Sequence, residues 1–304
     1  GAVTGWRAAL AGPWPDAAQK RRARDRLFDA LSDLTDRRFA EQEQGLAELY
    51  ELAEIPAPAE ETGEARKRRL EEQTDRQVRG LRLVARGRET QSRFADALRV
   101  YLDFEAPSAT LVQSPEEPAV QIAPAIWVQG RIRDLFERAT PAQRAEMERV
   151  VADQWEEVRS QADGARLQRF ADNYGPLLPE GRAALLLLAD RLVAEQKFPE
   201  ARLKLLLVLH LTQEVPPDGP DAVLAAQALD ALGRLNLKQG LLEDAAFYFK
   251  QLATRFPKVK VRDGRTGEEL YLDLATEKRF LPYPSRDAIP RRGVPAQPYT
   301  EITR

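Results

Sequence analysis

The chain has 304 residues, 31% of them charged, and its acids and bases nearly cancel to a net charge of −2. Its apolar share of 43% can build a core, which argues against wholesale disorder, and a general nucleic-acid binder would be strongly basic. The absence of cysteine excludes disulfides, thiolate metal sites and a cysteine nucleophile, and no apolar run is long enough to span a membrane.

The first third of the chain predicts an irregular start followed by helices. Residues 1–16 contain two tryptophans and two prolines, and we expect them to be irregular. Asp16 is a candidate N-cap for a helical pattern that stops before Pro56, because proline cannot continue a helix. Two further helical segments are expected over 64–90 and 93–104.

Four prolines separate this part from the next set of helices. They fall within residues 106–125, which we expect to be a linker without regular structure. Helices resume near Trp127. The run Thr140-Pro141-Ala142-Gln143 is a capping box with proline at the first helical position, a specific signal for a helix start.

Two helical hairpins are expected further along, over about 182–212 and 221–256. Beyond them, residues 258–261 and the turn signals of 263–267 predict a small hairpin or an extended segment, and a short helix is expected over 268–276. The tail from Pro282 is rich in proline and polar residues, and we expect it to be either extended and docked or disordered.

Alanine, leucine and arginine dominate the composition, and these residue types favour helices. The expected fold class is all-α, specifically an α-solenoid of stacked antiparallel hairpins; an irregular helical bundle is the alternative. The expected domains are an irregular segment (1–16), N-terminal hairpins (17–105), a linker (106–125), a C-terminal solenoid (126–257), and an extended segment with a short helix and tail (258–304).

Three stretches of the chain align with one another without gaps. They begin at residues 93, 197 and 241 and read "RFADALRVYLDF", "KFPEARLKLLLV" and "LLEDAAFYFKQL". Each places an alanine at the same position: Ala97, Ala201 and Ala245. This self-similarity predicts a repeated helical unit.

The segment 226–259 resembles a tetratricopeptide repeat, a pair of antiparallel helices about 34 residues long. The residues that carry the resemblance are Leu232, Gly233, Ala245, Phe249 and Pro257. Small residues allow close helix approach, the aromatic ring fills the space toward the next repeat, and proline stops the second helix. The motif's tryptophan and tyrosine are replaced by Leu229 and Asn236, so the copy is degenerate. Weaker copies lie over 182–215 and from Val78, and the resemblance covers about a third of the chain.

The two ends carry a second resemblance. The stretches "TGWRAALAGPWPDA" and "VKVRDGRTGEELYLDLATEKRFLPY" resemble segments that flank tetratricopeptide-type regions in planctomycete-type proteins with PQQ-type β-propeller blades. Such proteins are similar in layout to bacterial membrane-coat-like proteins. The resemblance implies an extracytoplasmic, periplasmic location, with the cytoplasm as the alternative. It also implies that the chain is either the solenoid part of a larger protein or a solenoid-only relative. Ala8 stands where the blade pattern has glycine, which weakens the match.

The sequence offers little that could catalyse a reaction. His210 is the sole histidine, so metal and triad chemistry lack parts. Neighbouring acids such as Glu156 and Glu157 point apart on a helix and make no acid–base pair. We expect a non-enzymatic protein without catalytic, cofactor-binding or metal-binding residues.

Arginines form a stripe along the helix predicted over 64–90. It consists of Arg69, Arg76, Arg79, Arg82 and Arg86. The repeat resemblance implies that Arg79, Arg82 and Arg86, and in the last repeat Gln227, Asp230, Arg234 and Lys238, line a concave groove. We interpret this groove as a site for an acidic peptide or for anionic lipid headgroups. The alternative is a solvated face, neutralised by the helix's own acids.

The expected function is a non-catalytic protein-interaction or assembly scaffold, with a membrane-coat-like structural role as a special case. Its partner would be another protein or an acidic peptide, and we expect no nucleic acid. One alternative is a peripheral membrane-surface protein that binds anionic lipid through basic helices. Another is an accessory solenoid of a quinoprotein-type β-propeller protein. The sequence does not specify the partner or the oligomeric state.

Overall fold

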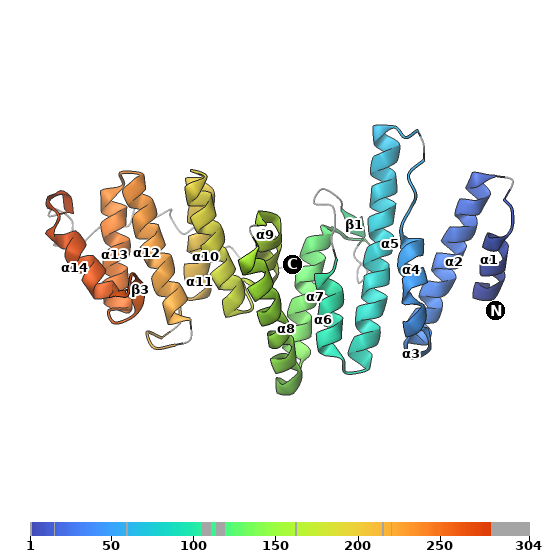
Figure 1. The fold of residues 1–304 in the computed structure, drawn as a ribbon, viewed down its shortest axis with the longest axis horizontal. Helices are drawn as coiled ribbons and strands as arrows, with labels where there is room; N and C mark the ends of the chain where they lie inside the picture. Colours follow the sequence, from blue (N-terminus) through green and yellow to red (C-terminus); the bar gives the residue numbers. More distant parts are fainter. Residues whose placement is uncertain are drawn as a thin grey trace, which may run out of the picture. The chain divides into compact units, whose positions relative to one another are not determined.

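The fold class is all-α, as predicted (Figure 1). A computed structural model describes residues 2–14, 16–58, 60–104, 111–113, 119–161, 163–214, 216–219 and 221–280. The chain divides into two compact units, Gly1–Glu180 and Gly181–Arg304. The predicted linker at 106–125 lies within the first of them.

Unit 1 is built from helices that pack on neighbours in the chain, with one pair of short strands. Its elements are α1 (Ala2–Ala11), α2 (Ala17–Arg37), α3 (Phe39–Gln42), the 3-10 helix η1 (Glu43–Gly45), α4 (Leu46–Ala53), α5 (Gly63–Thr90), α6 (Phe94–Leu102), β1 (Val112–Gln113), β2 (Gln121–Ile122), α7 (Pro124–Arg138), α8 (Pro141–Ser160) and α9 (Gly164–Tyr174). The capping box predicted at Thr140 is present and opens α8.

The prediction of an irregular segment over 1–16 is wrong for residues 2–11, which form α1. The physical reason is the position of the prolines: Pro13 and Pro15 come after Ala11, the last residue of the helix, in the sequence. Alanines, which have the highest helix propensity, occupy much of α1 itself, and the helix packs against α2.

The expected absence of regular structure over 106–125 is also wrong in part. Val112 and Gln113 pair antiparallel with Ile122 and Gln121, and α7 already begins at Pro124. Proline at the first position of a helix loses no hydrogen bond, so this proline starts α7 instead of preventing it.

Unit 2 contains two helical hairpins, a short strand pair and a final helix. Its elements are α10 (Pro179–Ala194, whose first two residues belong to unit 1), α11 (Phe198–Leu211), α12 (Ala222–Lys238), α13 (Leu242–Arg255), β3 (Lys260–Arg262), β4 (Arg265–Thr266), α14 (Gly267–Thr276) and the 3-10 helix η2 (Lys278–Phe280). Of the two alternatives predicted after α13, a hairpin or an extended segment, the structure has the hairpin, and the predicted short helix is confirmed. The tail from Pro282 lies outside the described residues.

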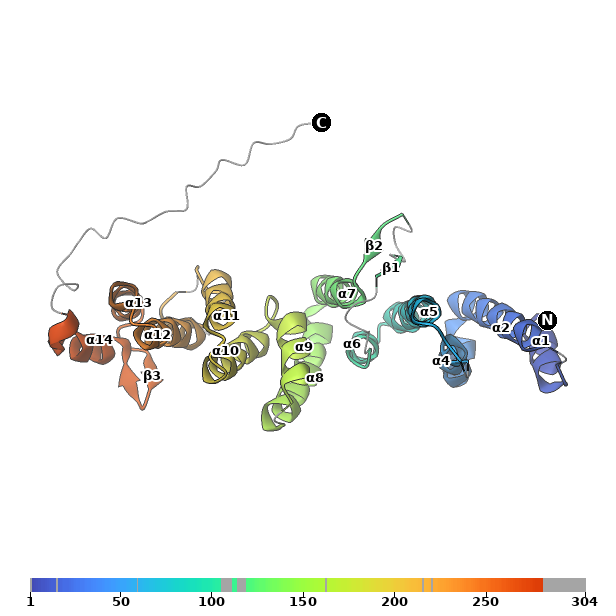
Figure 2. The same ribbon diagram turned by 90° about the horizontal axis from the view of Figure 1, so that it is seen from above.

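Two apolar clusters hold unit 2 together. One joins α10, α11 and α12 through residues such as Ala189, Leu205 and Leu232. The other joins α12 and α13 to α14 and includes Phe256 and Phe280. The strand β3 lies beside α12 (Figure 2), and β4 contacts β3 and α14. Most of the core of this unit therefore comes from contacts between successive helices.

Three interhelical turns, one in unit 1 and two in unit 2, have the same hydrogen-bond pattern. A residue with positive φ ends the first helix: Ser92 (63°), Gln196 (62°) and Gly240 (72°). The amide of the next residue donates to the carbonyl five positions back, from Arg93 to Arg88, Lys197 to Leu192 and Leu241 to Asn236. This is the Schellman motif, and in all three turns the following helix begins one residue later.

Candidate functional site

The arginine stripe on α5 is largely used in contacts within unit 1. Its partners are aspartates on α2: Asp25 for Arg76 (2.8 Å), Asp29 for Arg79 (2.9 Å) and Asp36 for Arg86 (3.7 Å). Arg69 instead makes two hydrogen bonds to Glu61, at 2.9 and 3.1 Å. The neutralising acids therefore come from α2 and from the loop before α5, and α5 itself adds Glu72, whose carboxylate accepts from Arg76 at 2.6 Å.

The spacing of the α2 aspartates explains this row of contacts. Asp25, Asp29, Asp33 and Asp36 follow one another at three or four residues, so they share one face of the helix. Phe28 lies between them, and the guanidinium carbons of Arg76 and Arg79 both lie 5.6 Å from its ring centroid. Charge pairing and cation–π contacts thus join α2 to α5.

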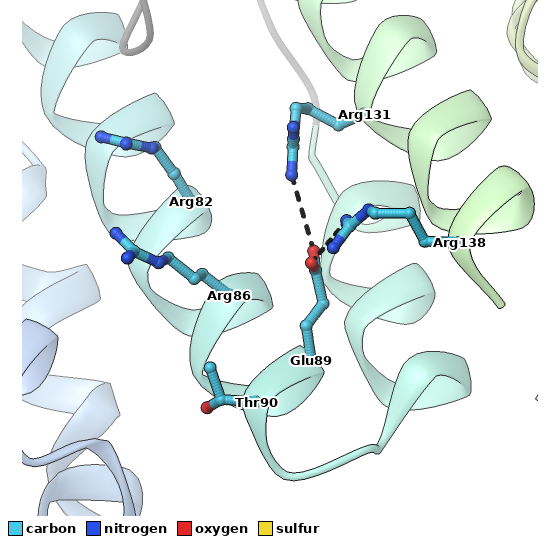
Figure 3. A pocket seen from close by; sticks show the side chains of 6 residues that line it. All are labelled: Arg82, Arg86, Glu89, Thr90, Arg131 and Arg138. Carbon is cyan, nitrogen blue, oxygen red and sulfur yellow. Dashed lines mark hydrogen bonds and ion pairs between the residues drawn. The ribbon is translucent and has the colours of Figure 1, made fainter.

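The C-terminal end of the stripe lines a pocket of about 440 Å³, which we call the arginine pocket. Arg82, Arg86, Glu89 and Thr90 come from α5, and Arg131 and Arg138 come from α7 (Figure 3). The pocket therefore combines four arginines from two helices with a single carboxylate.

Glu89 is the centre of one half of this pocket. Its side chain is 7% exposed, and its carboxylate lies 2.6 Å from Arg138 Nη2 and 3.8 Å from Arg131 Nη2. Figure 3 shows the guanidinium groups of Arg131 and Arg138 converging on Glu89, whereas Arg82 and Arg86 lie next to each other on α5.

Arg131 is held by several neighbours. It donates to Asp134 Oδ2 (2.8 Å) and to Tyr101 Oη (3.4 Å). Burial opposes its charge, but the hydrogen bond to Tyr101 and the carboxylates of Glu89 and Asp134 raise the pKa of Arg131 above its usual value. Its guanidinium is thus fixed in place and permanently charged.

This arrangement can bind an anion. A guanidinium donates two parallel hydrogen bonds to a carboxylate or phosphate, and such charge-assisted bonds are stronger than neutral ones. The lining has one acid among four arginines, and Asp36 and Asp134 outside it pair with Arg86 and Arg131, so an excess of positive charge remains that favours a negatively charged group. Among the described residues, no cluster of three or more histidine or acidic side chains could hold a metal ion.

Sequence reasoning placed Arg82 and Arg86 at a binding surface but missed Glu89, Arg131 and Arg138. A signal for the last two existed: they are seven residues apart on α7 and therefore lie on the same helix face. Their convergence on Glu89 depends on how α6 packs against both α5 and α7, which no local pattern specifies.

The groove positions predicted in the last repeat lie in a different pocket, of about 280 Å³, within unit 2. Gln227, Asp230 and Arg234 line it together with Arg262 of β3, and Lys238 is exposed and outside this lining. Asp230 is 2% exposed; its carboxylate accepts from Arg234 Nε at 2.9 Å and lies 3.6 Å from Arg262. Both arginines thus already have a carboxylate partner.

A second acid lines the same pocket. Burial raises the pKa of Asp190 above its usual value, and the Asp230 charge adds to the effect, whereas Arg234 and Lys238 oppose it. Two acids and two arginines leave this lining without net charge. It is therefore a weaker candidate for an anionic ligand than the arginine pocket.

The residues assigned to repeat packing lie in the interior. Ala97, Ala201, Ala245 and Leu232 are 0% exposed and Phe249 is 2% exposed. A Cβ added to Gly233 would come within 2.6 Å of the Phe249 ring, so only glycine fits there without a shift. Pro257 follows the end of α13 by two residues.

Comparison with protein-family models and with curated protein sequences found no match for this chain. Over the described residues, no helix is both long enough and apolar enough to span a membrane.

Proposed function

We propose that this chain is a non-catalytic scaffold for protein interaction, built as a tetratricopeptide-like α-solenoid, and that the arginine pocket binds an acidic segment of a partner protein. The observation that carries the binding proposal is the gathering of four arginines from α5 and α7 around one pocket.

The three Schellman turns support the repeat architecture. The sequence alignment set residues 93, 197 and 241 in one frame, and these are the residues whose amides make the five-back hydrogen bond. Four residues later each second helix buries an alanine completely: Ala97, Ala201 or Ala245. Common turn geometry and a common packing position are what a repeated unit requires.

The architecture suggests how binding would work. A single helical hairpin cannot bury its own apolar face, so neighbouring hairpins stack and leave an extended surface for a partner. The acidic segment of the partner would place its carboxylates against the four arginines of the pocket. Two of these, Arg82 and Arg86, belong to α5, and the other two, Arg131 and Arg138, belong to α7.

The test is fluorescence anisotropy of the full chain with a labelled octaglutamate peptide, compared with an uncharged serine–glutamine peptide, at low and high salt. We expect the acidic peptide alone to bind, and salt to weaken it. Arg82→Ala/Arg86→Ala should weaken binding about tenfold or more, because a lost hydrogen bond to a charged group costs about 1.5–3 kcal/mol.

Two further variants sharpen this test. Glu89→Gln removes the internal carboxylate that occupies Arg131 and Arg138, so peptide binding should tighten. Arg133→Ala removes an exposed arginine of α7 that does not line the pocket. It lowers the net charge by one unit and should leave the affinity for the peptide unchanged. Unchanged binding by the Arg82/Arg86 variant would contradict the proposal. Salt-sensitive binding to anionic vesicles without peptide binding would favour the membrane-surface alternative.

A further inference from the structure

A second pocket of unit 1 has a different chemistry from the arginine pocket. Its volume is about 470 Å³, and it lies among α6, α7, α8 and α9. Tyr101, Val128, Val158 and Phe170 form much of its apolar wall. The size falls in the range of about 300–1,000 Å³ that is typical of ligand sites.

One residue that lines this pocket has a polar atom without a partner. Gln154 Oε1 is buried, and no side chain or amide among the described residues donates a hydrogen bond to it. Buried acceptors are nearly always satisfied, because an unsatisfied one has lost its bond to water without gaining another. An occupant that brings an N–H or O–H donor would supply the missing bond.

The charged residues around the pocket balance. Arg166 and Arg169 line it together with Asp103 and Glu157, two of each sign. Arg166 Nη1 donates to Glu157 Oε1 at 2.8 Å, so part of this charge is satisfied within the protein. The pocket therefore suits a neutral occupant.

The aromatic rings of the wall are held in place by their neighbours. Phe170 stacks on Trp155 with ring centroids 5.3 Å apart and contacts Tyr174 at 4.8 Å. Tyr101 meets Trp127 edge-on at 5.9 Å. The wall is thus rigid before anything binds, which lowers the entropy cost of binding.

We propose that this pocket binds a tryptophan side chain of a partner protein, with the indole packed against Tyr101 and Phe170 and its N–H donating to Gln154 Oε1. Indole is aromatic, neutral and carries one donor, which matches the wall, the charge balance and the free acceptor. The rim is open, because the Glu157 and Arg166 side chains are 56% and 44% exposed, so a residue attached to a chain can enter.

The test is a ¹⁹F NMR titration of the full chain with acetyl-Gly-Trp-Gly-amide carrying 5-fluorotryptophan, compared with the same peptide methylated at the indole nitrogen. We expect the unmethylated peptide to bind about tenfold more tightly, the equivalent of about 1.4 kcal/mol for the lost hydrogen bond. In Gln154→Leu, which removes the acceptor, the two peptides should bind alike.

Ala125→Trp places a ring in the pocket from α7 and should abolish binding of both peptides. The matched control is Ala145→Trp, on an exposed position of α8 outside the pocket, which should leave binding intact. Equal binding of the two peptides to the natural chain, no binding of either, or insensitivity to Ala125→Trp would overturn the proposal. Arg82→Ala/Arg86→Ala should not affect these titrations, so the two proposed sites succeed or fail separately.

Discussion

At the scale of the residue, the three Schellman turns show how local strain is distributed. Gly240 adopts positive φ without cost, but Ser92 and Gln196 carry a Cβ in the same conformation. For residues other than glycine, the left-handed helical region costs about 1–2 kcal/mol. The turn geometry is kept in all three places, which indicates that the packing of the flanking helices outweighs this cost.

A matched pair of glycines tests this explanation. Gly240→Ala should destabilise unit 2 by about 1 kcal/mol, because alanine is strained at a φ of 72° although no atom stands in its way. Gly130→Ala is the same chemical change inside helix α7, also in open space, and it should stabilise unit 1 by about 0.5–1 kcal/mol. Urea unfolding followed by circular dichroism measures both. If both variants changed the free energy of unfolding in the same direction, strain at positive φ would not explain the effect of Gly240→Ala.

At the scale of the element, α2 and α5 illustrate how a basic stripe can be structural. Arg79 donates to Asp29 at 2.9 Å and to Asp33 at 3.4 Å, and all three side chains are largely solvated. Exposed pairs contribute only about 0–1 kcal/mol each. The two pairs that Arg79 makes therefore contribute little to stability individually.

Charge reversal should expose this contribution. Arg79→Glu places a carboxylate against Asp29 and Asp33, and we expect about 1 kcal/mol of destabilisation at low salt. In 1 M salt the loss should shrink, because the Debye length falls to about 3 Å. The double variant Arg79→Glu/Asp29→Arg should recover part of the stability. If the loss of stability were the same at low and high salt and the double variant did not recover it, the packing of the aliphatic part of Arg79, and not its charge, would be responsible.

At the scale of the whole molecule, the division into two units predicts that a substitution that unfolds part of one unit leaves the other unit folded. Ala245 is 0% exposed within the cluster that joins α12, α13 and α14. Each unit has its own buried residues, so unit 1 does not need this cluster in order to fold.

Ala245→Glu should therefore unfold the C-terminal hairpin of unit 2 alone. An unpaired charge in an apolar contact costs at least about 3 kcal/mol. Hydrogen exchange measured by mass spectrometry should show fast exchange over α12 to α14 and retained protection over α2 to α5. Gln251→Glu, a charge at a half-buried position of the same helix, should behave like the natural chain. A helical melt unchanged by Ala245→Glu would reject the packing assignment.

The sequence by itself determined the helical class, most helix positions, the capping box at Thr140 and the common frame of residues 93, 197 and 241. These features depend on hydrogen bonds that span three to five residues and on the helical period, both of which are visible in a short window. The sequence pattern did not reveal the N-terminal helix α1, because the prolines after it indicate irregular structure more strongly than the alanines within it indicate a helix.

Only the tertiary structure decided which charges meet. Arg79 and Asp29 are 50 residues apart in the chain, and Arg138 and Glu89 are 49 apart. The same arginine stripe could face solvent, a ligand or another helix, and its local pattern is identical in each case. The packing of α2 against one side of α5 neutralises much of the stripe, and the approach of α7 completes the arginine pocket. Side-chain partners depend on how whole helices pack, which involves contacts far beyond the range of any sequence motif.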